Sequence, residues 1–434
     1  MLQACRPPVI LLTLALLCPA FPASAQQLGR LPVVSQHLTP GLAGLQDDAL
    51  DRVARVEPRL KSALPRQTSI AIRLRRHAAV LDIDAAGAPV VRGEVIVIEP
   101  TPDTLARATA AGFRVTAEHT LAALGFRALV LRAGPGISTP EALATLRRIA
   151  PNGEFDYNHL YQDAGLSGTA HVALAAAPTP FPASSDTGFK VGLVDSGVAE
   201  QHPALAGVRI RRWGCQGRTV PDAHGSAVAS LLAGNPGGST PSGSTLYSAD
   251  IYCGDPTGGA VTGLVGALEW MAREGVPVIN LSMVGPSNAL LRKATEAIAG
   301  RGHLLVAAVG NDGPAAPPLY PAAYPHVIAV TAVNQRDRAL TEAGRGPHVE
   351  LAAPGEHPRT ALADGKWGPV RGTSFAAPLV ARAAAGRLAI PDPDAAKRVR
   401  AQLAADAVDL GRRGRDDTYG HGLIETKLAI AANK

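Results

Sequence analysis

Three polar side chains next to apolar stretches have the residue types that nucleophilic catalysis requires. Asp195 directly follows an apolar run, His224 opens an alanine-rich apolar stretch, and Ser374 follows Gly-Thr and precedes another such stretch. A serine hydroxyl is a weak nucleophile at neutral pH and needs a base beside it. A histidine can take the hydroxyl proton while a carboxylate orients the imidazole, so these residue types predict attack on an acyl carbon.

Each of these residues also has an ordinary structural explanation. An aspartate after a strand commonly caps a turn, a histidine before glycine commonly caps a helix, and Gly-Thr-Ser commonly forms a turn. The chain also contains rival serines and histidines, namely Ser196, Ser226, Ser282, His202 and His421. No rival serine follows Gly-Thr at a predicted helix start, so the set of Asp195, His224 and Ser374 is the best candidate.

The second half of the chain alternates apolar strands with helices. Strands are predicted at 190–194, 248–252, 276–281, 303–309 and 327–332, and helices at 225–233, 259–274, 289–300 and 374–388. This alternation favours an α/β fold whose mostly parallel sheet has helices on both faces. Catalytic groups in such sheets lie at the carboxyl ends of strands, which is where Asp195 is predicted to lie.

Further segments extend the pattern around the three candidate residues. The matching segments are Val191–Val198, Asp222–Ala229, Val278–Met283, Val306–Gly313, Tyr320–Val330, Leu351–Gly355, Arg371–Pro378 and Tyr419–Ile424. In this order and spacing they resemble the subtilisin-like serine proteases, or subtilases, over roughly residues 188–430. The order Asp, His, Ser is the order of the subtilisin triad.

The resemblance implies a subtilisin-like fold and a serine endopeptidase that forms an acyl-enzyme on Ser374. His224 is then the general base and acid, Asp195 orients it, and Asn311 and the Ser374 N–H donate to the oxyanion. The implied substrate-binding residues are Ser282, Met283, Val284, Gly285 and Gly310. No acidic residue stands out in these cleft segments, which favours an uncharged, apolar residue before the cut bond.

The order β-α-β-β-α-β is predicted within residues 91–160, which is typical of a ferredoxin-like domain. Subtilases often carry such a domain as a propeptide that assists folding and inhibits the active site. The resemblance therefore implies that 91–163 is a propeptide, that Phe155–Tyr161 lies in the cleft, and that the chain is cut between 160 and 186. The alternative is a permanent N-terminal domain.

The first residues predict a secretory signal peptide, 1–25. Arg6 precedes an apolar run at Val9–Leu17, and Ala-Ser-Ala ends at Ala25 as a cleavage site. We therefore expect a secreted protein, extracellular or periplasmic, with a retained anchor as the alternative. The remaining divisions are a lead-in segment at 26–90 with a helix at 45–64 and no assigned role, a linker at 164–187, and a catalytic domain at 188–434.

Cysteine usage agrees with export. Cys5 and Cys18 leave with the signal peptide, so only Cys215 and Cys253 remain. Two cysteines in an oxidising compartment predict one disulfide, with two free buried thiols as the alternative.

Composition limits the other partners. Of the 434 residues 46% are hydrophobic and 4% aromatic, and the net charge is +6. These values fit a globular chain and favour neither nucleic acid nor a membrane as partner. We expect a monomer whose partners are a peptide or protein substrate and its own propeptide.

No cofactor is expected for the chemistry. The calcium loop that subtilases carry near the histidine helix is replaced by Gly234–Gly243, which has no carboxylate. Calcium favours carboxylate oxygens, so a strong site there is not expected, while structural calcium elsewhere stays open.

Three departures from the subtilase pattern leave alternatives open. Ser226-Ala227 stands where Thr-His is usual, Phe375 stands where methionine is usual, and Val284 breaks the usual double glycine, which puts the cleft width in doubt. One alternative is a catalytically impaired subtilase fold that acts as a binding module. The other is an esterase or acyl transferase that uses the same triad.

Overall fold

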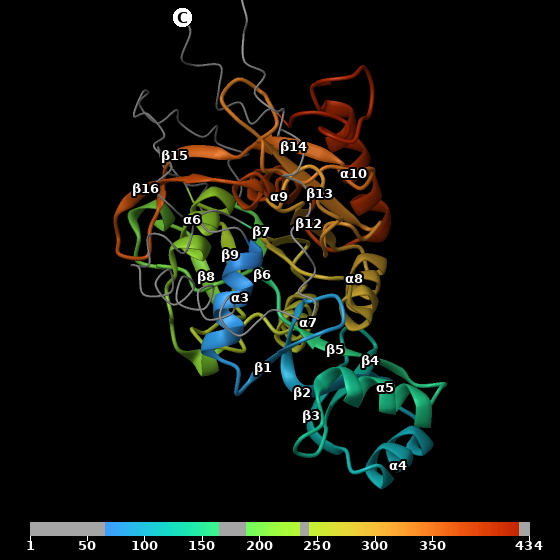
Figure 1. Ribbon diagram of the computed structural model, residues 1–434. Helices are drawn as coiled ribbons and strands as arrows, with labels where there is room; N and C mark the ends of the chain where they lie inside the picture. The colour runs from blue at the N-terminus through green and yellow to red at the C-terminus, as the bar shows by residue number, and fades with distance from the viewer. Residues whose placement is uncertain (1–65, 165–187, 235–242, 425–434) are drawn as a thin grey trace, which may run out of the picture. The chain divides into compact units, whose positions relative to one another are not determined.

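The computed structural model describes residues 66–164, 188–234 and 243–424 (Figure 1). The predicted signal peptide, the predicted helix at 45–64 and nearly all of the predicted linker lie outside the described residues. The described part contains an antiparallel α+β domain followed by an α/β domain with a seven-stranded parallel sheet.

The N-terminal domain has the predicted β-α-β-β-α-β order. Its elements are β2 (Pro89–Ile98), α4 (Pro102–Ala110), β3 (Arg114–Leu121), β4 (Phe126–Arg132), α5 (Thr139–Ile149) and β5 (Glu154–His159). All of its strand pairs are antiparallel, with β2 between β4 and β5. Thr101 and Ser138 cap the two helices through their side-chain oxygens, which is why both helices begin near the predicted residues.

Two elements of this domain precede the predicted boundary at residue 91. Helix α3 (Arg66–Arg76) leads into β1 (Leu81–Ile83), which pairs with β2 through Leu81 and Val91. Leu81 packs with Val91 and Leu160 in a small buried cluster. Part of the predicted lead-in is therefore built into the N-terminal domain. A three-residue strand shows too little alternation to be recognised in a sequence.

The second domain confirms the predicted α/β fold. Its sheet has the order β14-β13-β12-β10-β7-β9-β8, and every adjacent pair is parallel. The strands are β7 (Lys190–Asp195), β8 (Arg209–Trp213), β9 (Thr245–Asp250), β10 (Val278–Leu281), β12 (Leu304–Ala308), β13 (Val327–Val333) and β14 (Leu351–Pro354).

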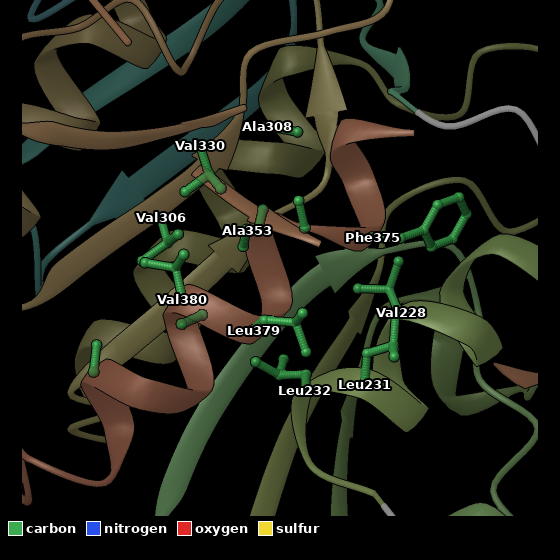
Figure 2. Packing of buried hydrophobic residues seen from close by; sticks show 14 of the residues in the cluster. Val228, Leu231, Leu232, Val306, Ala308, Val330, Ala353, Phe375, Leu379 and Val380 are labelled. Carbon is green, nitrogen blue, oxygen red and sulfur yellow. The ribbon is translucent and has the colours of Figure 1, made fainter. Parts of the chain in front are cut away.

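Helices cover both faces of this sheet because side chains of the strands alternate between the faces. On one face Val306 and Val330 lie in one buried cluster with residues of α9 (Ala377–Ala385) and, beyond them, of α6 (Ala223–Leu232), as Figure 2 shows. On the other face Leu305 and Ala329 share a cluster with residues of α7 (Val261–Arg273) and α8 (Ala289–Gly300). The strands are buried on both sides, which explains their continuous apolar runs.

Several elements of this domain were not predicted. They are β8, β14, the hairpin of β15 (Glu356–Ala361) and β16 (Trp367–Arg371), and α10 (Pro393–Asp406). Strand β8 lies at the edge of the sheet, and its sequence is dominated by Arg209, Arg211 and Arg212, whose side chains are exposed. Charged residues are expected on an edge strand. In the sequence, however, they interrupt the apolar pattern by which a strand is predicted.

The predicted disulfide between Cys215 and Cys253 is present and joins residues 38 positions apart. It connects the segments that follow the neighbouring strands β8 and β9, beside Asp250. In the chain-entropy model a loop of this length is worth about 4 kcal/mol. Among the described residues, no helix has the length and apolar character needed to cross a membrane.

Candidate functional site

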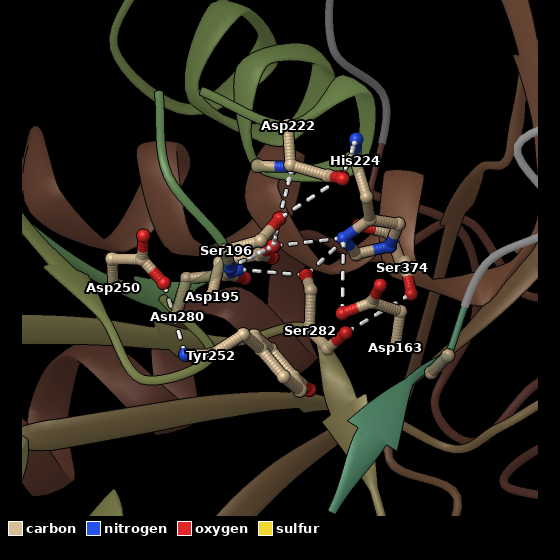
Figure 3. Close-up of polar contacts among 12 residues, drawn as sticks. Asp163, Asp195, Ser196, Asp222, His224, Asp250, Tyr252, Asn280, Ser282 and Ser374 are labelled. Carbon is tan, nitrogen blue, oxygen red and sulfur yellow. Dashed lines mark hydrogen bonds and ion pairs between the residues drawn. The ribbon is translucent and has the colours of Figure 1, made fainter. Parts of the chain in front are cut away.

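The buried end of β7 meets the first turn of α6. Asp195 is the last residue of β7, and its Oδ1 lies 2.8 Å from Nδ1 of His224 (Figure 3). Asp222 caps α6 by accepting the backbone N–H of His224 at 2.8 Å, which fixes where the histidine leaves the helix. Both Asp195 and His224 are almost fully buried, so their hydrogen bond is shielded from water.

Ser374 lies in a 3-10 turn, Thr373–Phe375, and the α-helix α9 begins only at Ala377. The helix predicted from residue 374 is therefore shorter, because Pro378 sits in its first turn and favours a start there. The turn packs against α6, and the Phe375 ring centroid is 5.3 Å from that of His224. The phenylalanine that departs from the subtilase pattern thus packs beside the imidazole.

The Ser374 hydroxyl donates to the carbonyl oxygen of Ser282 at 3.2 Å. The Nε2 atom of His224 is buried and has no hydrogen-bond partner within the described part of the chain. The serine–histidine hydrogen bond is therefore not formed in this state. Catalytic hydrogen bonds are often long or poorly aligned before the substrate reacts, so this geometry is compatible with a serine–histidine pair.

The side chain of Asn311 has a fixed orientation. Its Oδ1 accepts the backbone N–H of Thr373 at 3.1 Å, so its Nδ2 faces the other way. That Nδ2 donates to the carbonyl oxygen of Ala164, which also lies 3.5 Å from Oγ1 of Thr373. Asn311 is thus aimed at a peptide carbonyl, which is the predicted task of an oxyanion-hole donor.

The Ala164 carbonyl belongs to a short extended segment at the end of the N-terminal domain. There β6 (Gln162–Asp163) pairs antiparallel with β11 (Met283–Val284), and the Ala164 N–H donates to the Ser282 carbonyl at 3.2 Å. On the other side Tyr161 N–H donates to the Gly259 carbonyl at 2.7 Å. We call residues 160–164 the tail.

The tail differs from the predicted cleft segment Phe155–Tyr161. Residues 154–159 form β5 and pair with β2, so they belong to the sheet of the N-terminal domain. Only the residues after this strand can extend along β11. The register is set by strand pairing between distant segments, which a single sequence does not reveal.

The structure brings all five predicted substrate-binding residues to the tail or to the turn of Ser374. Ser282, Met283 and Val284 provide its partner strand, and the N–H of Gly310 donates to Oγ1 of Thr373 at 3.2 Å. Gly285 lies under the Tyr161 ring, since a Cβ there would come within 2.6 Å of it.

Asp163 of the tail adds a second carboxylate to the site. Its Oδ1 is 3.7 Å from Nδ1 of His224, and its side chain keeps 37% exposure. Burial alone lowers the pKa of His224, but the carboxylates of Asp195 and Asp163 outweigh it and raise this pKa well above 6.5. Partial loss of water around the Asp163 carboxyl raises its pKa to about 6; His224 opposes this rise, and the nearby carboxylate of Asp195 adds to it.

Helix α3 also reaches the site, which the sequence did not reveal. Arg66 at its start pairs with Asp312, next to Asn311, at 2.7 Å. Arg73, two turns later, donates to the carbonyls of Pro256 and Gly258 at 2.8 and 2.7 Å. A cavity of about 440 Å³ under the helix is lined by Ile72, Asp163, Asp222 and Tyr252, among others. The predicted helix ends at residue 64, so the sequence offered no signal for α3 beyond two arginines seven residues apart.

Two groups of side chains in the described residues come close enough to hold a metal ion, and both have other tasks. Cys215 and Cys253 form the disulfide beside Asp250, and Asp195 binds His224 near Asp163. The prediction of no strong calcium site concerns Gly234–Gly243, of which 235–242 lie outside the described residues. It therefore stays a prediction.

Comparisons with known proteins identify relatives of this chain. The Subtilase family profile (Peptidase S8) matches residues 186–422. Subtilisin amylosacchariticus of Bacillus subtilis subsp. amylosacchariticus is 33% identical over 254 residues, covering 55% of this chain and 65% of the relative. The minor extracellular protease Epr of Bacillus subtilis (strain 168) is 30% identical over 248 residues, covering 55% of this chain and 38% of the relative.

The chain thus spans less than two thirds of either relative. Among solved structures, fervidolysin from Fervidobacterium pennivorans, described as a keratinolytic enzyme related to subtilisin, has a TM-score of 0.63. That match covers 81% of this chain and 63% of that chain at 19% identity, so it concerns the fold alone. Because the family profile covers more than half of the chain and includes Asp195, His224 and Ser374, the chain belongs to the subtilase family.

Proposed function

We propose that the chain is a serine endopeptidase, made as a precursor that cuts itself after Ala164. The observation that carries this proposal is the Ala164 carbonyl, which accepts a hydrogen bond from Asn311 beside the turn of Ser374. The tail lies against β11 as an extended strand, the form in which a peptide substrate adds to a sheet edge.

The proposed reaction begins with a rotation of the Ser374 side chain. The Ser374 hydroxyl rotates away from Ser282, loses its proton to Nε2 of His224 and attacks the Ala164 carbonyl carbon. Asn311 stabilises the negative oxygen of the tetrahedral intermediate. The bond to the nitrogen of Gly165 then breaks, and His224 returns the proton to that nitrogen. Water hydrolyses the acyl-enzyme, which leaves a carboxyl group on Ala164 and a free Ser374.

The cleavage position is itself a test of this function. The purified chain should separate into an N-terminal fragment that ends at Ala164 and a fragment that begins at Gly165. Intact mass and N-terminal sequencing measure both ends. A cut elsewhere in 165–187 would contradict the register of the tail, and no cut would contradict self-processing.

Asp163→Asn is expected to let processing proceed at lower pH. His224 acts as a base only when neutral, so processing should rise with pH as the imidazole loses its proton. At 3.7 Å a carboxylate favours the cation by about 1 kcal/mol in a water-like dielectric, or roughly one pH unit. Removing it lowers the His224 pKa and should shift the acid limb of the processing rate down by about that amount.

The processing rates of the wild type and Asp163→Asn should differ most above pH about 6, where Asp163 carries its charge. Asp163→Glu, which keeps the charge, is the matched control and should leave the acid limb near its original position. The rate of processing from pH 5 to 11 measures both, because this range includes the raised His224 pKa of about 10. Identical acid limbs for the wild type and Asp163→Asn would show that this carboxylate does not act on His224.

Helix α3 is proposed to hold the N-terminal fragment on the enzyme after the cut. The Arg66–Asp312 pair is only 18% exposed on each side, and Arg73 binds two carbonyls. Since hydrogen bonds to charged groups are worth about 1.5–3 kcal/mol, the pair Arg66→Gln and Arg73→Gln should speed fragment release at least about tenfold.

The appearance of peptidase activity after dilution of the processed protein measures this release. Arg107→Gln is the matched control, because Arg107 forms an exposed pair with Asp103 inside α4 and makes no contact with the site. Equal release from the wild type and the double variant would mean that α3 does not retain the fragment.

We also propose that the protein is exported, to the periplasm or the extracellular space. The predicted signal peptide at 1–25 supports this, the disulfide suits an oxidising compartment, and one relative is an extracellular protease. A mature chain that retains residues 1–25 would contradict export by a cleaved signal.

A further inference from the structure

The tail places a small side chain at the residue before the cut bond. Ala164 precedes the peptide bond whose carbonyl meets Asn311, and it is only 3% exposed. It belongs to a buried apolar cluster that also includes Val284 and Leu319. A buried side chain whose neighbours are apolar leaves little open volume for a larger one.

Two aliphatic side chains converge on Gly310, whose N–H donates to the Thr373 hydroxyl that lies 3.5 Å from the Ala164 carbonyl. A Cβ built on Gly310 would lie 2.7 Å from Cδ1 of Leu319 and 3.3 Å from Cγ1 of Val284. Gly310 also has φ of +97°, where a side chain is disfavoured. Val284 takes the place of a small residue in the predicted cleft strand, and its branched side chain occupies the space that a glycine would leave.

A second buried side chain of the tail lies three residues upstream. Tyr161 is completely buried, its ring rests on Gly285, and its hydroxyl donates to the Pro286 carbonyl at 2.8 Å. Gly285 must lack a Cβ for the ring to fit. An aromatic residue with a hydroxyl therefore matches this position in both shape and hydrogen bonding.

From these contacts we infer that Val284 and Leu319 restrict the enzyme to cutting after alanine-sized residues preceded, three positions upstream, by a tyrosine. This inference rests on the proposed function and names its substrate class. A longer side chain before the cut bond has to displace Val284 or Leu319 from a packed cluster, which is unfavourable. A charged side chain before the cut bond would have to be buried in the same apolar cluster as Val284 and Leu319, which is also unfavourable.

The test uses the self-processed enzyme and p-nitroanilide peptides of sequence Leu-Tyr-Gln-Asp-X, which copy residues 160–163 of the tail. With X as alanine, kcat/KM should exceed that for phenylalanine by about 100-fold, in the range that tight apolar pockets achieve. Replacing the tyrosine of the peptide by alanine should lower kcat/KM by about tenfold or more. Equal rates for alanine and phenylalanine peptides would overturn the inference.

Two substitutions at the same residue should move the preference in opposite directions. The measured quantity is the ratio of kcat/KM for X as leucine to kcat/KM for X as alanine. Val284→Ala should raise this ratio by about tenfold, and Val284→Ile should lower it below the wild-type value. Leu319→Ala is a second widening variant, which keeps the test valid where one variant does not fold. Unchanged ratios in the folded variants would show that these side chains do not set the limit.

The failure of this inference can be told apart from failure of the proposed function. A fluorophosphonate probe reacts with an activated serine, whose oxygen attacks the phosphorus and displaces fluoride. It should label Ser374 in the processed wild type and should not label the Ser374→Ala chain. Labelling without a preference for alanine would overturn the inference alone. Absence of labelling in the wild type would overturn the proposed endopeptidase itself.

Discussion

The Ser374→Ala chain is expected to remain a single uncut polypeptide, whereas the wild type separates after Ala164. Alanine lacks the only atom that forms the acyl-enzyme, and the remaining residues cannot replace it. In subtilisin, loss of the nucleophile lowers kcat about 10⁶-fold, and we expect a comparable loss on a peptide substrate. Intact mass of the purified chains and peptide hydrolysis measure the two effects.

Ser226→Ala is the matched control for this prediction. Ser226 is a rival serine near His224 in sequence, but its hydroxyl accepts the Ala199 N–H at 2.9 Å and its side chain is fully buried. That variant should still cut itself. If the Ser374→Ala chain is cut after Ala164 as fast as the wild type, Ser374 is not the nucleophile for processing and the proposed mechanism fails.

The residues of the candidate site could be predicted because each is fixed by local structure. Asp195 ends a buried apolar strand, His224 lies in the first turn of a capped helix, and Ser374 occupies a turn before another helix. Such strand ends and helix starts leave a clear pattern in a short stretch of sequence. A parallel sheet then brings its strand ends to one edge, so the grouping follows from the fold.

The contacts of the tail could not be predicted because they join distant segments. Gln162 and Asp163 pair with residues of β11 about 120 positions later, and no local pattern specifies that register. The same holds for Arg66 and Asp312, which are 246 positions apart. A sequence shows that Arg66 is charged but not which carboxylate it meets.

The sequence shows Val284 as a departure from the subtilase pattern, but it does not show what this side chain does. Val284 stood out because a glycine was expected there, and only the position of the Gly310 backbone shows what its side chain occupies. The departure at Ser226 is similar, since its hydroxyl stabilises the loop at Ala199. Substitutions in a family pattern become interpretable once their neighbours are known.

Asn311→Leu is expected to lower kcat by about 10²–10³-fold while KM changes little. Leucine has nearly the shape of asparagine but has no N–H to donate to the Ala164 carbonyl. The donor matters most when the carbonyl oxygen gains negative charge, so its loss destabilises the transition state more than the bound substrate. Steady-state kinetics of the processed enzyme on an alanine-ending peptide separate kcat from KM.

The substitution also removes the acceptor for the Thr373 N–H, so its effect on the turn of Ser374 must be separated from the loss of the donor. Asn311→Asp keeps an oxygen that can accept this N–H but supplies no donor, and it should be impaired at least as strongly as Asn311→Leu. Asn334→Leu is the matched control. Asn334 also accepts backbone N–H groups of a turn, those of Arg336 and Arg338, and its replacement should leave kcat unchanged. If Asn311→Asp retains wild-type kcat, the side chain only orders the turn, and the oxyanion must be stabilised by backbone N–H groups alone.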